Sequence, residues 1–409
     1  MHSPTLARLR WSAKSFTMFA RGARSAAFST ALFVAVASAA ATAAFAQGGR
    51  LDQALVKSPR DGSLNAVYGT VKQYELGKVV IEVAGKDVTY DSNRVPRIVS
   101  WGDAPAPLHD GVRSLAAGAF EDAVKAFRSA SSSAQRDIVK ASAKAMTADA
   151  LWRWGASDAT RFTEAVAECE SFAASFATHR DLPFVQQVHA RALWLSGKPA
   201  EAGAAFKSIY AKLSGDKVAD GYDADECMRA GLSAARALLD AKDTLGAREI
   251  YAGLESSVGP LVAGLAADDA RKPVLQAVLD EAMLGAGYVD LAAGQSKQAL
   301  TFFQNKVNGL NANSPLSTRN SAMLGLGEAL LAEGKFRDAS LQLAKVAALE
   351  AADIDRAARA TVKLAEAYSK LTDADSRQQA CARVKDVISR FGLAPASVRA
   401  RQLAKELGC

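Results

Sequence analysis

Apolar and polar residues alternate along residues 64–101, whereas the pattern from residue 108 onward is helical. The segments AVYGTVKQY, KVVIEVAG and KDVTYDS are rich in β-branched and aromatic residues, and Leu76-Gly77-Lys78 and Ala84-Gly85-Lys86 separate them. Alternation broken by glycine-containing turns predicts three to five short strands. Because so few strands bury little core by themselves, we expect this unit to pack against the segment that follows it.

One set of spacings recurs through the helical part of the chain. A glycine is followed by an alanine five positions later and by a bulky apolar residue nine positions later. The copies are Gly118/Ala123/Phe127, Gly197/Ala202/Phe206, Gly294/Ala299/Phe303 and Gly334/Ala339/Leu343, with Lys242/Ala247/Tyr251 as a fifth copy that lacks the glycine.

The physical meaning of this spacing is a helical hairpin. Glycine accepts the left-handed backbone that ends a helix. The alanine and the bulky residue are four positions apart, so they share one face of the next helix. The small residue allows the two helices to approach closely, and the bulky residue fills the space beyond it. Neither helix buries its face alone, so the hairpins are predicted to stack as a solenoid.

These patterns divide the chain into segments. We expect a flexible N-terminal segment at residues 47–63, a small β module at 64–102, a linker at 103–108 and a helical repeat domain at 109–409. The predicted fold class is mainly α, an α-solenoid of helical hairpins preceded by a β-barrel-like or β-sheet module. The composition agrees, because 49% of residues are hydrophobic but only 7% are aromatic and 11 are proline.

The first 46 residues have the pattern of an export signal. A basic stretch precedes the apolar run AAFSTALFVAVASAAATAAFA, which ends in Ala44-Phe45-Ala46 before Gln47. This pattern predicts a bacterial signal peptide at residues 1–46 and export to the periplasm or cell envelope. The apolar run is about 20 residues long, so an uncleaved membrane anchor remains a second interpretation.

The net charge of +7 comes mostly from this leader. Residues 1–46 contain five basic and no acidic side chains, which leaves 45 basic and 43 acidic side chains for the remainder. A nearly neutral chain does not favour nucleic acid as a partner.

In its repeated helical-hairpin spacing, the chain resembles tetratricopeptide repeat proteins over roughly residues 108–391. In LGLGEALLAEGKFRDASLQLAKV, residues 324–346, Leu326-Gly327 matches the leucine-glycine pair of the first helix, and Gly334, Phe336 and Ala339 match the turn and the second helix. The further matching segments are 111–130, 148–172, 191–209 and 362–388. The anchors lie 40 to 79 residues apart, against about 34 in the family, so an irregular superhelix is expected. The signal and strand segments together resemble exported repeat proteins of planctomycete-type bacteria, and the V-x-G-x-V start resembles a small Sm-like barrel.

The tetratricopeptide resemblance implies ligand contacts on the inward side of the first helix of each hairpin. The matching positions are Arg191, Arg236, Tyr288, Glu328 and Glu366. Their mixed charge does not favour a basic clamp for a peptide tail. For each of them, a surface position that binds no ligand remains the alternative.

The sequence lacks the common motifs for catalysis and metal binding. The chain has no G-x-S-x-G, H-E-x-x-H or P-loop sequence, no CxxC pair and no histidine pair at i, i+4. We therefore predict no catalytic residues, no metal and no cofactor. The acidic pairs Asp280-Glu281 and Asp353/Asp355 are interpreted as solvated helix faces.

Cys381 and Cys409 lie near the start of one predicted helix and the end of the next. In an antiparallel hairpin these ends are adjacent, so an oxidising compartment would permit a disulfide. The alternative is that Cys381 is a small core residue and Cys409 lies on a frayed terminus. Cys169 and Cys227 are predicted to be buried apolar residues.

Taken together, the sequence predicts an exported scaffold or adaptor that binds a protein or peptide and catalyses no reaction. The competing hypothesis is an envelope-complex organiser that an uncleaved N-terminal helix anchors to the membrane. A third, an accessory module that binds carbohydrate or peptide for an enzyme, also remains open.

Overall fold

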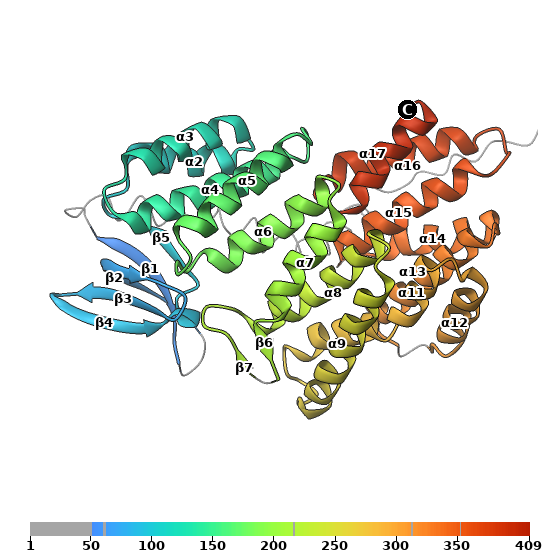
Figure 1. Cartoon of the computed structure of the whole chain (residues 1–409), viewed down its shortest axis with the longest axis horizontal. Helices are drawn as coiled ribbons and strands as arrows, with labels where there is room; N and C mark the ends of the chain where they lie inside the picture. The colour runs from blue at the N-terminus through green and yellow to red at the C-terminus, as the bar shows by residue number, and fades with distance from the viewer. Residues whose placement is uncertain (1–50, 60–62, 216, 312–313, 352) are drawn as a thin grey trace, which may run out of the picture.

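The computed structural model describes residues 51–409, apart from 60–62, 216, 312–313 and 352 (Figure 1). The chain is mainly helical, and an antiparallel sheet precedes the helices. The predicted signal peptide at residues 1–46 lies outside the described residues. Within the described part, no helix combines the length and the hydropathy needed to cross a membrane.

The sheet has five strands in the order β4-β3-β2-β1-β5, and every neighbouring pair is antiparallel. The long strand β2 pairs with β1 along its first part and with β3 along its second part. The strands are β1 (Asp52–Lys57), β2 (Leu64–Tyr74), β3 (Lys78–Val83), β4 (Lys86–Asp91) and β5 (Arg97–Ser100). The strand prediction for 64–101 is therefore confirmed, as a sheet with edges at β4 and β5.

The expectation of a flexible segment at residues 47–63 is wrong for the part that contains β1. This strand lies between β2 and β5, and its Ala54 and Val56 are buried. The carboxylate of Asp52, which is 1% exposed, accepts hydrogen bonds from the backbone N–H groups of Val71 and Gly102, each at 2.7 Å. The polar residues around a short alternating stretch obscured it, because pairing on both sides is a tertiary effect.

Helices fill the rest of the described chain. They are α2 (Ala106–Ala116), α3 (Phe120–Ser133), α4 (Asp137–Trp154), α5 (Arg161–Ser175), α6 (Leu182–Leu195), α7 (Pro199–Tyr210), α8 (Ala224–Asp240), α9 (Thr244–Gly264), α10 (Lys272–Ala282), α11 (Gly285–Ala292), α12 (Ser296–Asn308), α13 (Leu316–Ala332), α14 (Phe336–Leu349), α15 (Ile354–Ser369), α16 (Ser376–Arg390) and α17 (Ala396–Leu407). The predicted linker at 103–108 is shorter than expected, because α2 already begins at Ala106. A two-stranded ribbon, β6 (Leu213–Ser214) and β7 (Lys217–Val218), separates α7 from α8.

The hairpin prediction is confirmed at its turns. All five anchor positions have a left-handed backbone, with φ between 67° and 84°. They are Gly118, Gly197, Lys242, Gly294 and Gly334, and each lies between two consecutive helices. The alanine and bulky residues that follow each anchor are at most 3% exposed. The spacing therefore encodes both the turn and the packing face of the second helix.

Close approach of the paired helices depends on small residues in the first helix as well. At Gly327 on α13, an added Cβ would lie 2.7 Å from Cγ of Leu343 on α14. At Gly111 on α2, it would lie 2.5 Å from the ring of Phe127 on α3. A side chain at either position would have to displace the bulky residue opposite, so glycine sets the distance between the helices there.

The sheet packs against the helices through a charged and an aromatic contact. Arg136, just before α4, donates hydrogen bonds to both carboxylate oxygens of Asp52 at 2.7 and 2.8 Å and to the carbonyl oxygen of Val71 at 3.0 Å. On the other side, the ring of His179 lies edge-on to Tyr74 of β2, 5.2 Å between ring centres. The β module therefore packs against the helical part of the chain, as we expected from its small number of strands.

The helical hairpins follow an arc that bends back on itself, so that α17 returns toward α4–α7 (Figure 1). Arg401 on α17 donates a hydrogen bond to the carbonyl oxygen of Ala156 in the α4–α5 turn, at 3.3 Å across 245 positions of sequence. Its guanidinium also lies 5.8 Å from the ring centre of Phe162. A cavity lies on the inner side of this arc.

Candidate binding site

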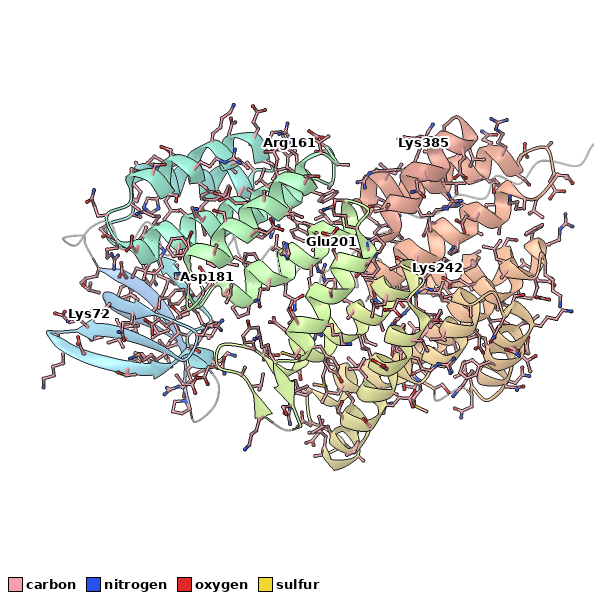
Figure 2. All side chains as sticks on the ribbon, in the orientation of Figure 1. Lys72, Arg161, Asp181, Glu201, Lys242 and Lys385 are labelled. Carbon is pink, nitrogen blue, oxygen red and sulfur yellow. A yellow bond between two sulfur atoms is a disulfide. The ribbon has the colours of Figure 1, made fainter. Side chains whose placement is uncertain are left out.

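The inner side of the arc holds a cavity of about 640 Å³. Side chains from α6, α7, α8, α10, α11, α13, α15 and α17 line it, together with residues of the α6–α7 and α8–α9 turns. One of these is Lys242, which Figure 2 labels. The volume lies within the range of about 300–1,000 Å³ that is usual for ligand sites. We call this space the concave cavity.

Four of the five predicted binding residues line the concave cavity. Arg236, Tyr288, Glu328 and Glu366 come from α8, α11, α13 and α15, so the structure brings together positions that are far apart in sequence. Arg191 on α6 is exposed and is not part of the lining, although its positive charge acts on Asp355, which is. Four of the residues predicted to face inward therefore share one surface, and the role of that surface in binding stays a prediction.

Arg236 and Glu281 form a two-point ion pair between α8 and α10. The Nε atom of Arg236 donates to Oε1 of Glu281 at 2.5 Å, and its second contact goes to Oε2. Arg356 on α15 approaches the same carboxylate at 3.6 Å and pairs with Glu350 at 2.7 Å. The interpretation of Asp280-Glu281 as a solvated face is wrong for Glu281, which is 4% exposed and bound by arginine.

Arg359 and Glu328 form the second such pair, between α15 and α13. Two hydrogen bonds of 2.5 and 2.6 Å join the guanidinium to the carboxylate. The same guanidinium lies 4.7 Å from the ring centre of Tyr288, whose hydroxyl donates to the carbonyl oxygen of Ser321 at 3.3 Å. Burial raises the pKa of Tyr288, so its hydroxyl stays protonated.

A third group of charges lies toward α17. Glu366 accepts hydrogen bonds from Lys363 at 2.8 Å and from Arg399 at 2.6 Å. Arg399 also binds Glu406 at 2.6 Å. Burial acts to raise the pKa of Glu366, but Lys363 and Arg399 together lower it by more. The pKa therefore lies below its usual value, and the carboxylate stays ionised.

Two carboxylates of the cavity have no cationic hydrogen-bond partner among the described residues. Asp240, at the end of α8, accepts a hydrogen bond from the indole Nε1 of Trp194 at 2.9 Å. Asp355, in the first turn of α15, has no side-chain hydrogen bond or ion pair within the described chain. Asp240 is exposed and Asp355 is half-buried, and partial desolvation raises the pKa of each carboxyl group, against the opposing effect of Arg359 on Asp240 and of Arg191 on Asp355.

The sequence did not predict the residues that pair with the predicted binding residues. Glu281, Arg359 and Asp240 complete the pairs or flank them, and Asp355 was interpreted as a solvated face but lines the cavity. A usable signal was present, because Arg236 and Asp240, like Asp355 and Arg359, are four apart and so share one helix face. Buried charges held in this way are rigid donors and acceptors, so the cavity can recognise a ligand by charge and hydrogen bonding.

The four cysteines lie outside the concave cavity. Cys381 on α16 and Cys409 are joined by a disulfide with their Cα atoms 5.6 Å apart, and Cys169 and Cys227 are buried and free. Within the described residues, no group of three or more His, Cys, Asp or Glu side chains is placed to hold a metal ion.

No protein-family model matches this chain and no curated protein matches it, so the resemblance to tetratricopeptide repeat proteins rests on the residues themselves.

Proposed function

We propose that this chain is an exported scaffold or adaptor of the tetratricopeptide type, which binds a segment of a partner protein in the concave cavity and catalyses no reaction on it. One observation carries the proposal: four of the five positions that the repeat resemblance marks as ligand-facing line a single cavity of about 640 Å³. The leader at residues 1–46 supports export to the periplasm or cell envelope.

The cavity offers a direct test through two neighbouring alanines. Ala292 on α11 lines the cavity, whereas Ala293 is exposed and does not. We expect Ala292→Trp to fill the cavity and abolish capture of a partner from the envelope fraction, with Ala293→Trp capturing it as the wild type does. Circular dichroism melting of both variants shows whether they are folded. Equal capture by both variants would exclude the cavity as the site.

The apolar run at residues 26–46 supports a second candidate, an envelope-complex organiser held by an uncleaved N-terminal helix. N-terminal sequencing of the protein from its producing cell separates the two. A chain that starts at Gln47 supports the exported scaffold, and a chain that retains the leader supports the membrane-held form.

A further inference from the structure

Some charged side chains in the wall of the concave cavity have ion-pair partners, and others have none among the described residues. Each lining arginine is bound by at least one carboxylate: Arg236 by Glu281, Arg356 by Glu350 and Asp353, Arg359 by Glu328, and Arg399 by Glu366 and Glu406. Glu281, Glu328 and Arg356 are 4–7% exposed, so their pairs are largely buried, whereas the pair of Arg399 and Glu406 is exposed. An acidic ligand that binds one of these arginines would have to displace its carboxylate, which at the buried pairs would leave a charge without its partner.

Asp240 and Asp355 differ from the other carboxylates of the cavity because no arginine or lysine binds them. Asp240 uses one oxygen for the indole of Trp194, and its other oxygen has no hydrogen bond among the described residues. Arg359, one turn after Asp355, acts on Asp240, and Arg236, one turn before Asp240, acts on Asp355. Asp240 on α8 and Asp355 on α15 both line the concave cavity, so each helix contributes a carboxylate to its wall.

The remaining lining suits a long side chain. Tyr288, Leu239 and Leu291 add aromatic and aliphatic surface to the cavity. A lysine or arginine stem can pack on such surface while its charged end reaches a carboxylate. Two exposed cations, Lys242 in the cavity lining and Arg191 outside it, form no ion pair within the described chain, so they do not occupy the two carboxylates.

We propose that Asp240 and Asp355 receive a lysine or arginine side chain from the bound segment of the partner protein. The inference rests on the proposed function and adds the chemistry of the ligand. Charge complementarity supports it, because a basic side chain supplies the hydrogen-bond donors that these two carboxylates lack, whereas every lining arginine already has a partner.

The test uses three pools of random decapeptides that are identical except for a fixed central residue, lysine, glutamate or glutamine. Binding to the purified protein is measured by fluorescence anisotropy. We expect the lysine pool to bind about tenfold tighter than the glutamine pool, and the glutamate pool to bind weakest. Asp240→Asn with Asp355→Asn should remove the preference for lysine over glutamine.

The matched control is Asp338→Asn, because Asp338 lies in the first turn of α14 as Asp355 lies in the first turn of α15, but it is exposed and outside the cavity. This variant should keep the preference. Equal binding of all three pools, blocked by Ala292→Trp, would overturn the inference and leave the proposed function standing. Binding that favours glutamate would also overturn it. If no pool binds, or if Ala292→Trp leaves binding intact, the proposed function itself fails.

Discussion

Arg359 and Glu328 face each other across the gap between α15 and α13, joined by hydrogen bonds of 2.5 and 2.6 Å. The carboxylate is 7% exposed, so the pair is held away from bulk water. Together with the pair of Arg236 and Glu281, it ties helices of different hairpins to one another along the cavity wall. The cavity is therefore lined by charges that also hold the arc in shape.

Breaking this pair should cost far more than breaking a surface pair. Glu328→Gln leaves the partly buried guanidinium of Arg359 without its counter-charge, and we expect a loss of about 3–5 kcal/mol in the free energy of unfolding, measured with urea. Glu328→Leu combined with Arg359→Met should recover most of that loss. Glu121→Ala, which removes the exposed partner of Lys125 on α3, is the control and should leave stability unchanged. A loss below about 1 kcal/mol for Glu328→Gln would contradict the importance of the buried pair.

The left-handed turns provide a second prediction. At Gly334 the backbone has φ = 75°, where a Cβ is strained, so Gly334→Ala should lower the free energy of unfolding by about 1–2 kcal/mol. Lys242 adopts φ = 67° at the equivalent turn and already carries that strain. Lys242→Ala should therefore change stability by less than about 0.5 kcal/mol in the same urea titration. Equal losses at the two positions would show that the backbone conformation is not the cause.

The disulfide between Cys381 and Cys409 fastens the C-terminal residue beside α16. We expect intact mass after alkylation to show two fewer free thiols without reductant than with it. Replacing both cysteines by serine should lower the free energy of unfolding by about 2–4 kcal/mol, and reductant should destabilise the wild type but not this variant. Alkylation of Cys381 and Cys409 in the untreated protein would rule the bond out.

His179 predicts how stability depends on pH. Its ring is 6% exposed among Tyr74, Phe172 and Phe176, and this burial lowers its pKa despite the opposing effect of Asp181 at 3.6 Å. Because the folded state favours the neutral ring, its contribution is complete above the unfolded-state pKa of about 6.5. It then decreases as the pH falls through that value toward the lower pKa of the folded state.

The slope that a single proton can add is at most about 1.4 kcal/mol per pH unit. Urea titrations between about pH 7.5 and 5 should show a shallower decline for His179→Phe, which keeps the ring contacts and does not titrate. His109→Gln, at an exposed position on α2, should decline as steeply as the wild type. An unchanged slope in His179→Phe would mean that another group governs the acid response.

The local structure of this protein follows from short-range rules that its sequence states directly. The spacing acts within one hairpin: a glycine ends a helix, an alanine follows five positions later and a bulky residue nine positions later. The sequence alone therefore assigned Gly334 to a turn and Ala339 and Leu343 to the core. The strands of residues 64–101 alternate for the same local reason. Strand β1 was missed because it depends on partners on both sides, and the carboxylate of Asp52 is held by Arg136, 84 positions away.

The tertiary structure alone decided which charged residues meet. The sequence marked Arg236 and Glu328 as inward-facing, but Glu281 and Arg359 pair with them from helices 45 and 31 positions away. Ion pairing at such separations depends on how the hairpins stack, and no local period encodes it. The curvature of the arc likewise brings Arg401 to Ala156, and that curvature sums small angles between successive hairpins. The repeat spacing therefore determined the hairpins, and their packing decided the cavity and the two carboxylates left open within it.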